Sequence, residues 1–591
     1  MKVSYFLLIL LFTFLGISCQ TAKENTKINN EKIVLYQMMV RLFGNQNQTN
    51  AHYGSKEENG VGKFDDITTV ALTEIKSLGV SHIWYTGILE HATMTDYTTY
   101  GINLDDGDVI KGRAGSPYAI KDYYDVDPDL AVKVEQRIEE FEALIKRTHA
   151  LDLKVIIDFI PNHVAREYQS DKKPAGVRDF GEDDDTNKSF STTNDFYYIP
   201  REQFLVPTQE GLNLPQFEGD IRDGKFNENP AKATGNNIFS AKPSNQDWYE
   251  TVKLNYGIDY QNGNKAYIDP IPPVWEKTKE ILLYWAEKGV DGFRCDMAEM
   301  VPVEFWNWVI PQVRIKYPEL IFIAEAYDPA VYEKYLTIGK FDYLYDKVGL
   351  YDALKPLIKN EEEADVEQIR KSRSFIKDYQ NQFLSFLENH DEERIASEGF
   401  AKNPIYAQPA MVVSATISGG PIMLYFGQEV GEPGEGNEGY GGEDNRTTIF
   451  DYWGVPEHQK WMNEGKFDGG GLSITQKHLR SSYERLLQFV KNDPVIANGT
   501  FTEIEVSSNT PKKVYAFIRS FENKHVLVVA NFNRDPASVN IKLPKELLNN
   551  RDKTLTINKI LTEDSFQTSS FHKGISLQIE PSFAQILKFE L

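Results

Sequence analysis

The feature that most constrains the fold of this chain is a regular alternation of short apolar runs with amphipathic stretches. The apolar runs have the length and composition of buried strands, and the stretches between them carry apolar residues at helical spacing. The strand-like runs lie at 32–42, 80–85, 154–159, 290–296, 320–325, 341–345, 381–387 and 421–426, and helical stretches lie at 65–78, 132–150, 274–288, 302–315, 407–418 and 475–490. This alternation predicts an α/β fold, a (β/α)8 TIM barrel.

Two segments fall outside the repeat. Residues 164–273 are polar and rich in Asp, Asn, Gly and Pro, and they are too numerous for an ordinary loop. We therefore expect a small subdomain inserted after the third strand, above the mouth of a barrel formed by 31–163 and 274–491. From 492 to 591 apolar residues recur at every second position, which predicts a C-terminal antiparallel β-sandwich.

The first thirty residues predict export. Lys2 precedes an apolar run at 5–15 that is too short for a good membrane span, as in a signal peptide. The segment 16–19 resembles a bacterial lipoprotein cleavage box, so residues 1–19 are expected to be a lipoprotein-type signal peptide with Cys19 as the lipidated residue. The polar stretch 20–30 would then be a tether. The expected location is the cell envelope, on the periplasmic face or the cell surface, and plain secretion is the alternative.

The net charge and the cysteine content limit the kinds of binding partner that the sequence predicts. The net charge is -23 and the pI about 5.0, which argues against nucleic acid as a partner. Contact with a membrane is expected only through the N-terminal lipid anchor. Of the two cysteines, Cys19 is assigned to the lipid, which leaves Cys295 without a partner. Strand alternation points Cys295 away from the barrel interior, so we expect it to serve in packing.

Acidic and polar residues gather where the predicted strands end. Active sites of such barrels lie at the C-terminal ends of the strands. About one β/α unit separates Asp296 from Glu325, and about two separate Glu325 from Asp391, so these carboxylates share one rim. The residues at the ends of the third, fourth, fifth and seventh strands are Asp158, Asn162, His163, Arg294, Asp296, Glu325, His390 and Asp391.

Together these four segments resemble the signature segments of the α-amylase superfamily of glycoside hydrolases, family thirteen. The resemblance covers about residues 31–590 and includes the insertion after strand three, which is called subdomain B in that family. It implies that Asp296 is the catalytic nucleophile and Glu325 the general acid/base. It also implies that Asp391 is the third acid, which binds sugar hydroxyls and stabilises the transition state.

The resemblance assigns further residues to the sugar in subsite −1. Arg294 matches the residue that orients the nucleophile, and Asp158 matches a supporting carboxylate. His163 and His390 match residues that hold sugar hydroxyls. Tyr118, in the run 116–123, is similar to the aromatic residue that stacks under the sugar.

The implied function is a retaining glycoside hydrolase that cleaves α-1,4-glucosidic bonds of starch-derived malto-oligosaccharides, so the expected partner is an α-glucan. A retaining enzyme needs one ionised carboxylate as nucleophile and a second, protonated carboxyl as acid. Arg294 next to Asp296 is expected to keep that nucleophile ionised. The alternatives are an α-1,6-acting or transglycosylating α-glucan enzyme and, in a different class, a non-catalytic glycan-binding lipoprotein.

No organic cofactor is expected, and calcium remains open. Asn162 matches a calcium ligand of the family, but many members carry Lys-His where this chain has Glu299 and Met300. Two other oxygen-rich loops are candidate metal sites, and the alternative for each is a solvated turn. They are the segment 45–49 and the series Asn103, Asp105, Gly107 and Asp108, which loosely resembles a calcium loop.

Overall fold

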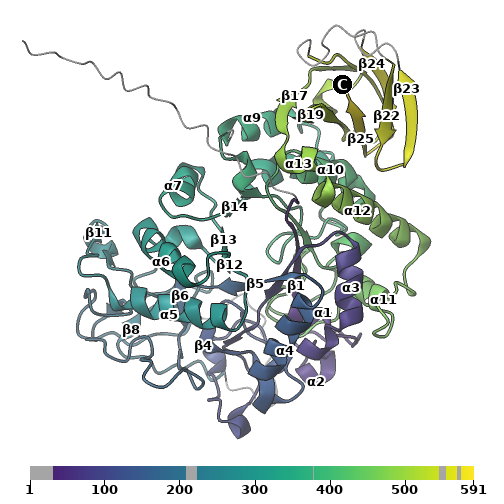
Figure 1. Cartoon of the computed structure of the whole chain (residues 1–591). Coiled ribbons are helices and arrows are strands. Elements are labelled where there is room, and N and C mark those ends of the chain that lie inside the picture. Colours follow the sequence, from purple (N-terminus) through teal and green to yellow (C-terminus); the bar gives the residue numbers. More distant parts are fainter. Residues whose placement is uncertain (1–30, 208–221, 377, 545–553, 569–573) are drawn as a thin grey trace, which may run out of the picture.

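The computed structural model describes residues 31–207, 222–376, 378–544, 554–568 and 574–591 (Figure 1). The predicted signal peptide, the tether and Cys19 lie outside the described residues. At the centre of the described chain stands an eight-stranded parallel sheet. The strands follow the order β15-β14-β13-β12-β5-β2-β1-β16. Ser385, just after β15, forms a parallel bridge with Ile422 of β16, and this bridge joins the two edges into a barrel.

The strands of the barrel correspond to the eight apolar runs. They are β1 (Val34–Met39), β2 (His82–Thr86), β5 (Lys154–Phe159), β12 (Gly292–Cys295), β13 (Ile321–Ala324), β14 (Tyr343–Tyr345), β15 (Phe383–Leu384) and β16 (Ile422–Tyr425). The prediction of a (β/α)8 barrel is therefore confirmed. The run 32–42 was predicted too long, because its last residues turn into the short helix α1 (Val40–Phe43).

Helices surround this barrel (Figure 1). The longer ones are α3 (Thr69–Ser77), α4 (Arg137–His149), α5 (Pro273–Glu287), α6 (Val303–Lys316), α8 (Asp352–Lys359), α9 (Glu367–Phe375), α10 (Gln408–Thr416) and α12 (Ile474–Asn492). Shorter ones are α2 (Lys56–Asn59), α7 (Tyr332–Thr337), α11 (Pro456–Met462) and α13 (Pro494–Asn498).

The two faces of each barrel strand pack into different layers. Leu35, Trp84, Ile156 and Ile323 belong to an apolar cluster contributed by the barrel strands. Cys295 instead belongs to the large apolar layer that contains the helices, and it is fully buried there without a disulfide partner. This is the packing position that strand alternation predicts.

The excursion after β2 contains a hairpin that the sequence did not reveal. Its strands are β3 (Leu89–His91) and β4 (Ile120–Val126), which pair antiparallel with irregular register. The irregular register interrupts the period-2 pattern that identifies strands in a sequence.

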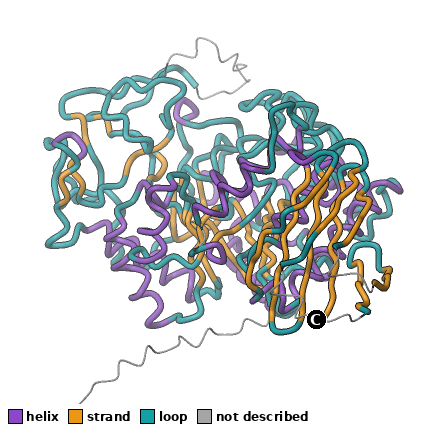
Figure 2. Tube along the Cα trace, turned by 90° about the horizontal axis from the view of Figure 1, so that it is seen from above, coloured by secondary structure: helices purple, strands orange, loops and turns teal. Residues whose placement is uncertain are grey.

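Subdomain B is mostly loop with a few short strands (Figure 2). These are β6 (His163–Ala165), β7 (Tyr198–Ile199), β8 (Ala231–Lys232), β9 (Thr251–Lys253), β10 (Ile258–Asp259) and β11 (Lys265–Ala266). Strand β6 continues directly from the end of barrel strand β5 and pairs with β9, so this pairing joins subdomain B to the barrel rim.

The C-terminal region contains two antiparallel sheets. One has the order β17-β19-β20-β25-β22-β23 and the other β18-β21-β24. The strands are β17 (Thr500–Glu503), β18 (Val506–Ser508), β19 (Val514–Phe521), β20 (Lys524–Asn531), β21 (Ala537–Ile541), β22 (Leu555–Lys559), β23 (Asp564–Thr568), β24 (Ile575–Ile579) and β25 (Phe583–Glu590). Residues of both sheets share one apolar core, separate from that of the barrel, as in a β-sandwich. Among the described residues, no helix is long and apolar enough to span a membrane.

Candidate active site

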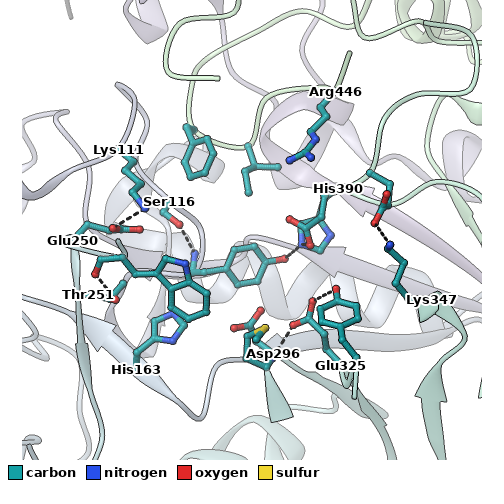
Figure 3. Close-up of a pocket in the computed structure, with 18 of the residues that line it drawn as sticks. Lys111, Ser116, His163, Glu250, Thr251, Asp296, Glu325, Lys347, His390 and Arg446 are labelled. Atoms are coloured by element: carbon teal, nitrogen blue, oxygen red, sulfur yellow. Dashed lines mark hydrogen bonds and ion pairs between the residues drawn. The ribbon is translucent and has the colours of Figure 1, made fainter. Parts of the chain in front are cut away.

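A pocket of about 550 Å³ opens at the C-terminal ends of the barrel strands (Figure 3). Of the residues predicted from the sequence, six line this pocket: Tyr118, His163, Asp296, Glu325, His390 and Asp391. Arg294 and Asp158 lie beneath it and contact these residues. The structure therefore brings all eight predicted catalytic and sugar-binding residues into one place.

Arg294 connects the carboxylates of the site. Its Nη1 donates to Asp296 Oδ1 at 2.7 Å and to Asp158 Oδ1 at 3.3 Å, and its Nη2 lies 2.9 Å from Glu325 Oε1. Its Nε donates to the Tyr345 hydroxyl at 3.1 Å. The guanidinium is fully buried, so its charge acts on these carboxylates with little screening by water.

The local chain path explains why these groups converge. Strand alternation directs Arg294 and Asp296 to the same side of β12. Parallel pairing places Arg294 opposite Asp158 of β5 and Ile323 of β13, and the Glu325 amide donates to the Cys295 carbonyl at 3.0 Å. Asp296 and Glu325 therefore end neighbouring strands at the same height.

The sequence predicts an ionised Asp296, but the surroundings of Asp296 in the free site oppose its ionisation. Burial and the neighbouring Glu325 carboxylate raise the pKa of Asp296 well above its usual range, although Arg294 opposes this. Arg294 is shared among three carboxylates, so it does not hold Asp296 ionised by itself. Two buried carboxylates this close titrate as a coupled pair, and burial opposes the ionisation of Asp296 within it.

Glu325 accepts contacts from three directions. Besides Arg294, the Tyr327 hydroxyl donates to its Oε1 at 2.6 Å and the Met297 amide donates to its Oε2 at 2.7 Å. Met297 has a left-handed backbone with φ 41°, which is uncommon for a residue with a side chain. That conformation accompanies the amide contact to Glu325, so the position directly after Asp296 helps to fix the second carboxyl.

Asp391 lies on another wall of the pocket, and its side chain is partly exposed to solvent. Its Oδ2 is 3.0 Å from His390 Nε2, and its side chain is 41% exposed. Burial opposes ionisation of Asp391, but the contact with His390 and the charges of Arg294 and Arg446 lower its pKa to about 2. Asp391 is therefore ionised at neutral pH.

His390 joins this wall to Tyr118. The Tyr118 hydroxyl and His390 Nε2 are 2.6 Å apart, the two rings stack at 5.2 Å, and Gln37 Nε2 is 2.8 Å from His390 Nδ1. Asp158, below them, accepts from Trp84 Nε1 at 2.9 Å. These contacts fix the ring planes that face the pocket.

On the other wall, His163 starts the short strand that leads into subdomain B. Burial and the charges of Lys253 and Lys111 lower its pKa to about 3, so the imidazole is neutral. Its ring lies 5.2 Å from that of Trp248, which also lines the pocket. Tyr249 and Tyr256, close to Trp248 in the sequence, are buried in packing instead.

A sequence model of the alpha-amylase catalytic domain matches residues 40–462, most of the chain. The chain belongs to the alpha-amylase family. This family membership makes the chain a glycoside hydrolase, relatives named alpha-amylase agree with it, and a structural neighbour of that name shares the fold.

Among the relatives of this amylase-family chain, Alpha-amylase 3 of Dictyoglomus thermophilum is 24% identical over 477 residues, 75% of this chain and 80% of that protein. An alpha-1,4-glucan:maltose-1-phosphate maltosyltransferase of Cereibacter sphaeroides is 26% identical over 265 residues, 40% of this chain and 38% of that protein. The alpha-amylase of Geobacillus thermoleovorans, solved with acarbose, shares the fold with a TM-score of 0.60 at 20% identity, covering 95% of this chain and 98% of that one.

The calcium ligand that the resemblance implies does not fit a bound cation here. The ammonium of Lys253 donates to Asn162 Oδ1 and, at 3.3 Å, to the carbonyl of Met300. Lys253 is 1% exposed, and its amino group lies where a calcium ion would bind those same oxygens; burial lowers the pKa of Lys253 to about 7. The Asn162 amide nitrogen meanwhile donates to the Gly235 carbonyl at 2.9 Å. A buried lysine thus links the barrel rim to subdomain B, and the reaction proposed below involves no metal at Asn162.

The two other oxygen-rich loops are internally satisfied. Asp105 Oδ1 is 2.7 Å from Lys121 Nζ, and Asp108 Oδ2 accepts the amides of Asp223, Gly224 and Lys225. In the segment 45–49, Asn45 Oδ1 accepts the Asn47 amide, and its Nδ2 donates to two carbonyls. These oxygens hold loops together, so neither segment fits a metal site.

Several lining residues were not predicted. Tyr327 follows Glu325 by two positions, so strand alternation could have placed it on the same side. The others come from loops far apart in the chain, and no local pattern marks them. They include Lys111, Glu250, Lys347, Val348, Glu392, Arg446, Ile449 and Phe450. The glycine-rich segment 431–442 does not contribute to this lining, and its Glu438 is buried.

Proposed function

We propose that this chain is a retaining hydrolase that cleaves α-1,4-glucosidic bonds of starch-derived malto-oligosaccharides through a covalent glycosyl-enzyme. The observation that carries the proposal is the single guanidinium of Arg294 that contacts both Asp296 and Glu325 at the floor of an open pocket. Retaining glycosidases need two carboxyl groups about 5–5.5 Å apart, closer than inverting enzymes do. Two carboxylates that share one guanidinium support the shorter separation.

In the first half-reaction, a carboxylate oxygen of Asp296 attacks the anomeric carbon from below the sugar. The bond from that carbon to the glycosidic oxygen breaks, and the carboxyl proton of Glu325 moves to the leaving oxygen. This step requires Asp296 to be ionised, although burial and the neighbouring Glu325 raise its pKa. Arg294 contacts both groups and stabilises the negative charge in either position.

In the second half-reaction, water attacks the anomeric carbon of the glycosyl-enzyme. Glu325, now ionised, takes a proton from the water, and the bond to Asp296 breaks with the electron pair returning to that carboxylate. Two inversions give net retention at the anomeric carbon.

The walls of the pocket supply sugar contacts. Tyr118 offers a ring face and His163 a neutral imidazole, and His390 and Asp391 offer polar groups for sugar hydroxyls. Asp391, ionised and half-exposed, is placed to accept hydrogen bonds from two hydroxyls of the same ring. Asp158 is not among the residues that line the pocket and contacts Arg294 and Trp84, so its role is to position those two side chains.

A transglycosylating activity is the second candidate, because relatives of this chain include maltosyltransferases. In that reaction a sugar hydroxyl replaces water in the second half-reaction, and the first half-reaction is unchanged. The α-1,6-acting alternative differs only in which glycosidic bond is positioned for attack by Asp296. A purely glycan-binding role is disfavoured because Asp296, Glu325 and Asp391 all face the pocket.

Incubation with maltoheptaose, pullulan and panose tests this proposal. We expect shorter maltodextrins from maltoheptaose, with matching release of reducing ends. Products longer than maltoheptaose, without new reducing ends, would replace the hydrolase proposal by the transglycosylase. Cleavage of panose at its α-1,6 bond with maltoheptaose left intact would contradict the linkage assignment.

We also propose export with a lipid anchor at Cys19, which rests on the sequence alone. Expression in a bacterial host with labelled palmitate should give a labelled, membrane-bound protein, whereas Cys19→Ala should give an unlabelled one. An unlabelled wild-type protein in the medium would support plain secretion instead.

A further inference from the structure

A second group of buried carboxylates lies away from the pocket. Its members are Glu90 on β3, Asp122 and Asp125 on β4, and Asp171 at the start of subdomain B. One oxygen from each of the four lies within 4.8 Å of the others. Glu90, Asp122 and Asp125 are at most 1% exposed, and only Asp171 is exposed.

The cluster carries more negative charge than its surroundings neutralise. Arg137 of α4 is its cationic partner: its Nε donates to Asp125 Oδ2 at 2.8 Å, and its Nη2 lies 3.2 Å from Asp171 Oδ2. The ammonium of Lys121, next in sequence to Asp122, turns away and pairs with Asp105. Four carboxylates therefore face one guanidinium, and burying such an excess is costly unless a cation or protons offset it.

Glu90 is the observation that points to a ligand. Both of its carboxylate oxygens are buried and have no hydrogen-bond partner among the described residues. Glu90 stands directly opposite Asp122 in the β3–β4 pairing, and like charges at such a position repel. By contrast, Asp122 accepts the Tyr124 amide at 2.7 Å and the Lys172 amide at 3.0 Å. Glu90 is thus a buried carboxylate aimed at three others with nothing to bind.

We propose that Glu90, Asp122, Asp125 and Asp171 form a binding site for one calcium ion. Calcium binds oxygen ligands at about 2.3–2.6 Å, so ligands on opposite sides of the ion are up to about 5 Å apart. The 4.8 Å limit of this cluster fits that span. Carboxylate-only ligands favour a hard divalent cation over zinc or copper.

The site would join three parts of the chain. Glu90 and the two β4 residues belong to the hairpin that follows β2, and its second strand, β4, begins two residues after Tyr118. Asp171 belongs to the first loop of subdomain B. A bound ion would therefore hold the hairpin, the start of subdomain B and, through Arg137, the helix α4 together.

Calcium titration of the purified full-length protein, stripped with EDTA, tests the site. Isothermal calorimetry should show one strongly bound calcium per chain with weaker binding of magnesium. The thermal unfolding midpoint should rise by several degrees on calcium addition, because an ion that binds only the folded state stabilises it. Neither readout depends on enzymatic activity.

Glu90→Gln is the decisive variant, since it keeps the size of the side chain and removes its charge. It should weaken calcium binding at least tenfold and abolish the calcium-dependent rise in midpoint. Glu142→Gln, at a partly exposed α4 carboxylate paired with Lys288, is the matched control and should behave as wild type. If Glu90→Gln does not fold, Asp171→Asn at the exposed end of the cluster replaces it.

Two results would overturn the proposal. If the wild type binds no calcium and its midpoint is the same with calcium and with EDTA, the cluster is held by protons on its carboxyl groups. If both Glu90→Gln and Asp171→Asn keep the affinity of the wild type, the ion binds elsewhere.

Discussion

The chain buries two groups of carboxylates around an arginine, and the two groups are built differently. Arg294 contacts three carboxylates at the floor of an open pocket, and both oxygens of Glu325 have partners. Arg137 contacts two carboxylates in a closed cluster, where both oxygens of Glu90 have none.

The difference teaches how buried charge is used. In the pocket, the unbalanced charge faces the space where substrate binds, and the coupled pair can exchange a proton during the reaction. In the cluster around Arg137, three of the four carboxylates are buried and only Asp171 is exposed, so the unbalanced charge points to a small ion. The presence of buried carboxylates does not by itself distinguish a substrate pocket from an ion site. The hydrogen-bond partners of each carboxylate oxygen do distinguish them.

The largest expected effect comes from Asp296→Asn. Removing the attacking carboxylate should lower kcat by a factor on the order of 10³–10⁵, as the loss of a central catalytic group does in other enzymes. The same change removes one of two repelling buried carboxylates, so the unfolding midpoint should rise. Activity assays and thermal unfolding measure both effects, with the surface variant Asp183→Asn as control. Unchanged turnover would refute the nucleophile assignment.

Arg294→Met and Arg137→Met compare the two arginines directly. Arg294→Met leaves three carboxylates without their cation and should cost about 3–5 kcal/mol in the free energy of unfolding. Arg137→Met should cost less, about 1–3 kcal/mol, because its partner Asp171 is exposed.

Urea unfolding with and without calcium completes this comparison. Calcium should recover part of the loss in Arg137→Met and none of it in Arg294→Met. Equal responses of the two variants to calcium would contradict the distinction between the clusters. Arg178→Met removes an exposed ion pair with Asp183 and should cost about 0–1 kcal/mol.

A buried histidine outside both clusters shows what burial does without charged neighbours in contact. His458 is fully buried, and burial lowers its pKa to about 3. Its ordinary pKa is about 6.5, so above that pH it is neutral in both states and adds no pH dependence. Below it, only the unfolded chain takes up the proton, and stability is lost as pH falls toward the folded pKa.

His458→Gln should therefore flatten the pH dependence of stability. Between pH 6.5 and 5 the wild type should lose roughly 2 kcal/mol more than the variant, from about 1.4 kcal/mol per pH unit for one proton. Urea unfolding at these two pH values measures the difference. Parallel loss in both proteins would show that His458 is protonated in the folded state.

Much of the fold could be predicted because the barrel repeats a local pattern. The strand predicted at 154–159 matches β5 residue for residue, and the ends of the other strands shift by at most three residues. The hairpin β3–β4 was not predicted, since its irregular pairing carries no regular period. The β15 strand is two residues long, because the barrel closes there through the single bridge at Ser385.

The site could be predicted where residues end strands and could not be where loops contribute. Asp296, Glu325 and Asp391 follow from strand ends at barrel intervals. The amino group of Lys253 takes the place of a metal cation at Asn162, and this depends on a contact between residues 91 positions apart in the sequence. The protonation of Asp296 likewise depends on how Arg294 is shared, which no sequence spacing reveals.

The stereochemistry of the first product tests the central claim, that Asp296 and Glu325 act as nucleophile and acid/base of a retaining enzyme. Proton NMR of malto-oligosaccharide hydrolysis, recorded before mutarotation, resolves the two anomers of the new reducing end. The two-step reaction predicts that the α-anomer forms first and the β-anomer appears only later by mutarotation. Initial formation of the β-anomer would mean direct attack by water and would contradict a covalent intermediate on Asp296.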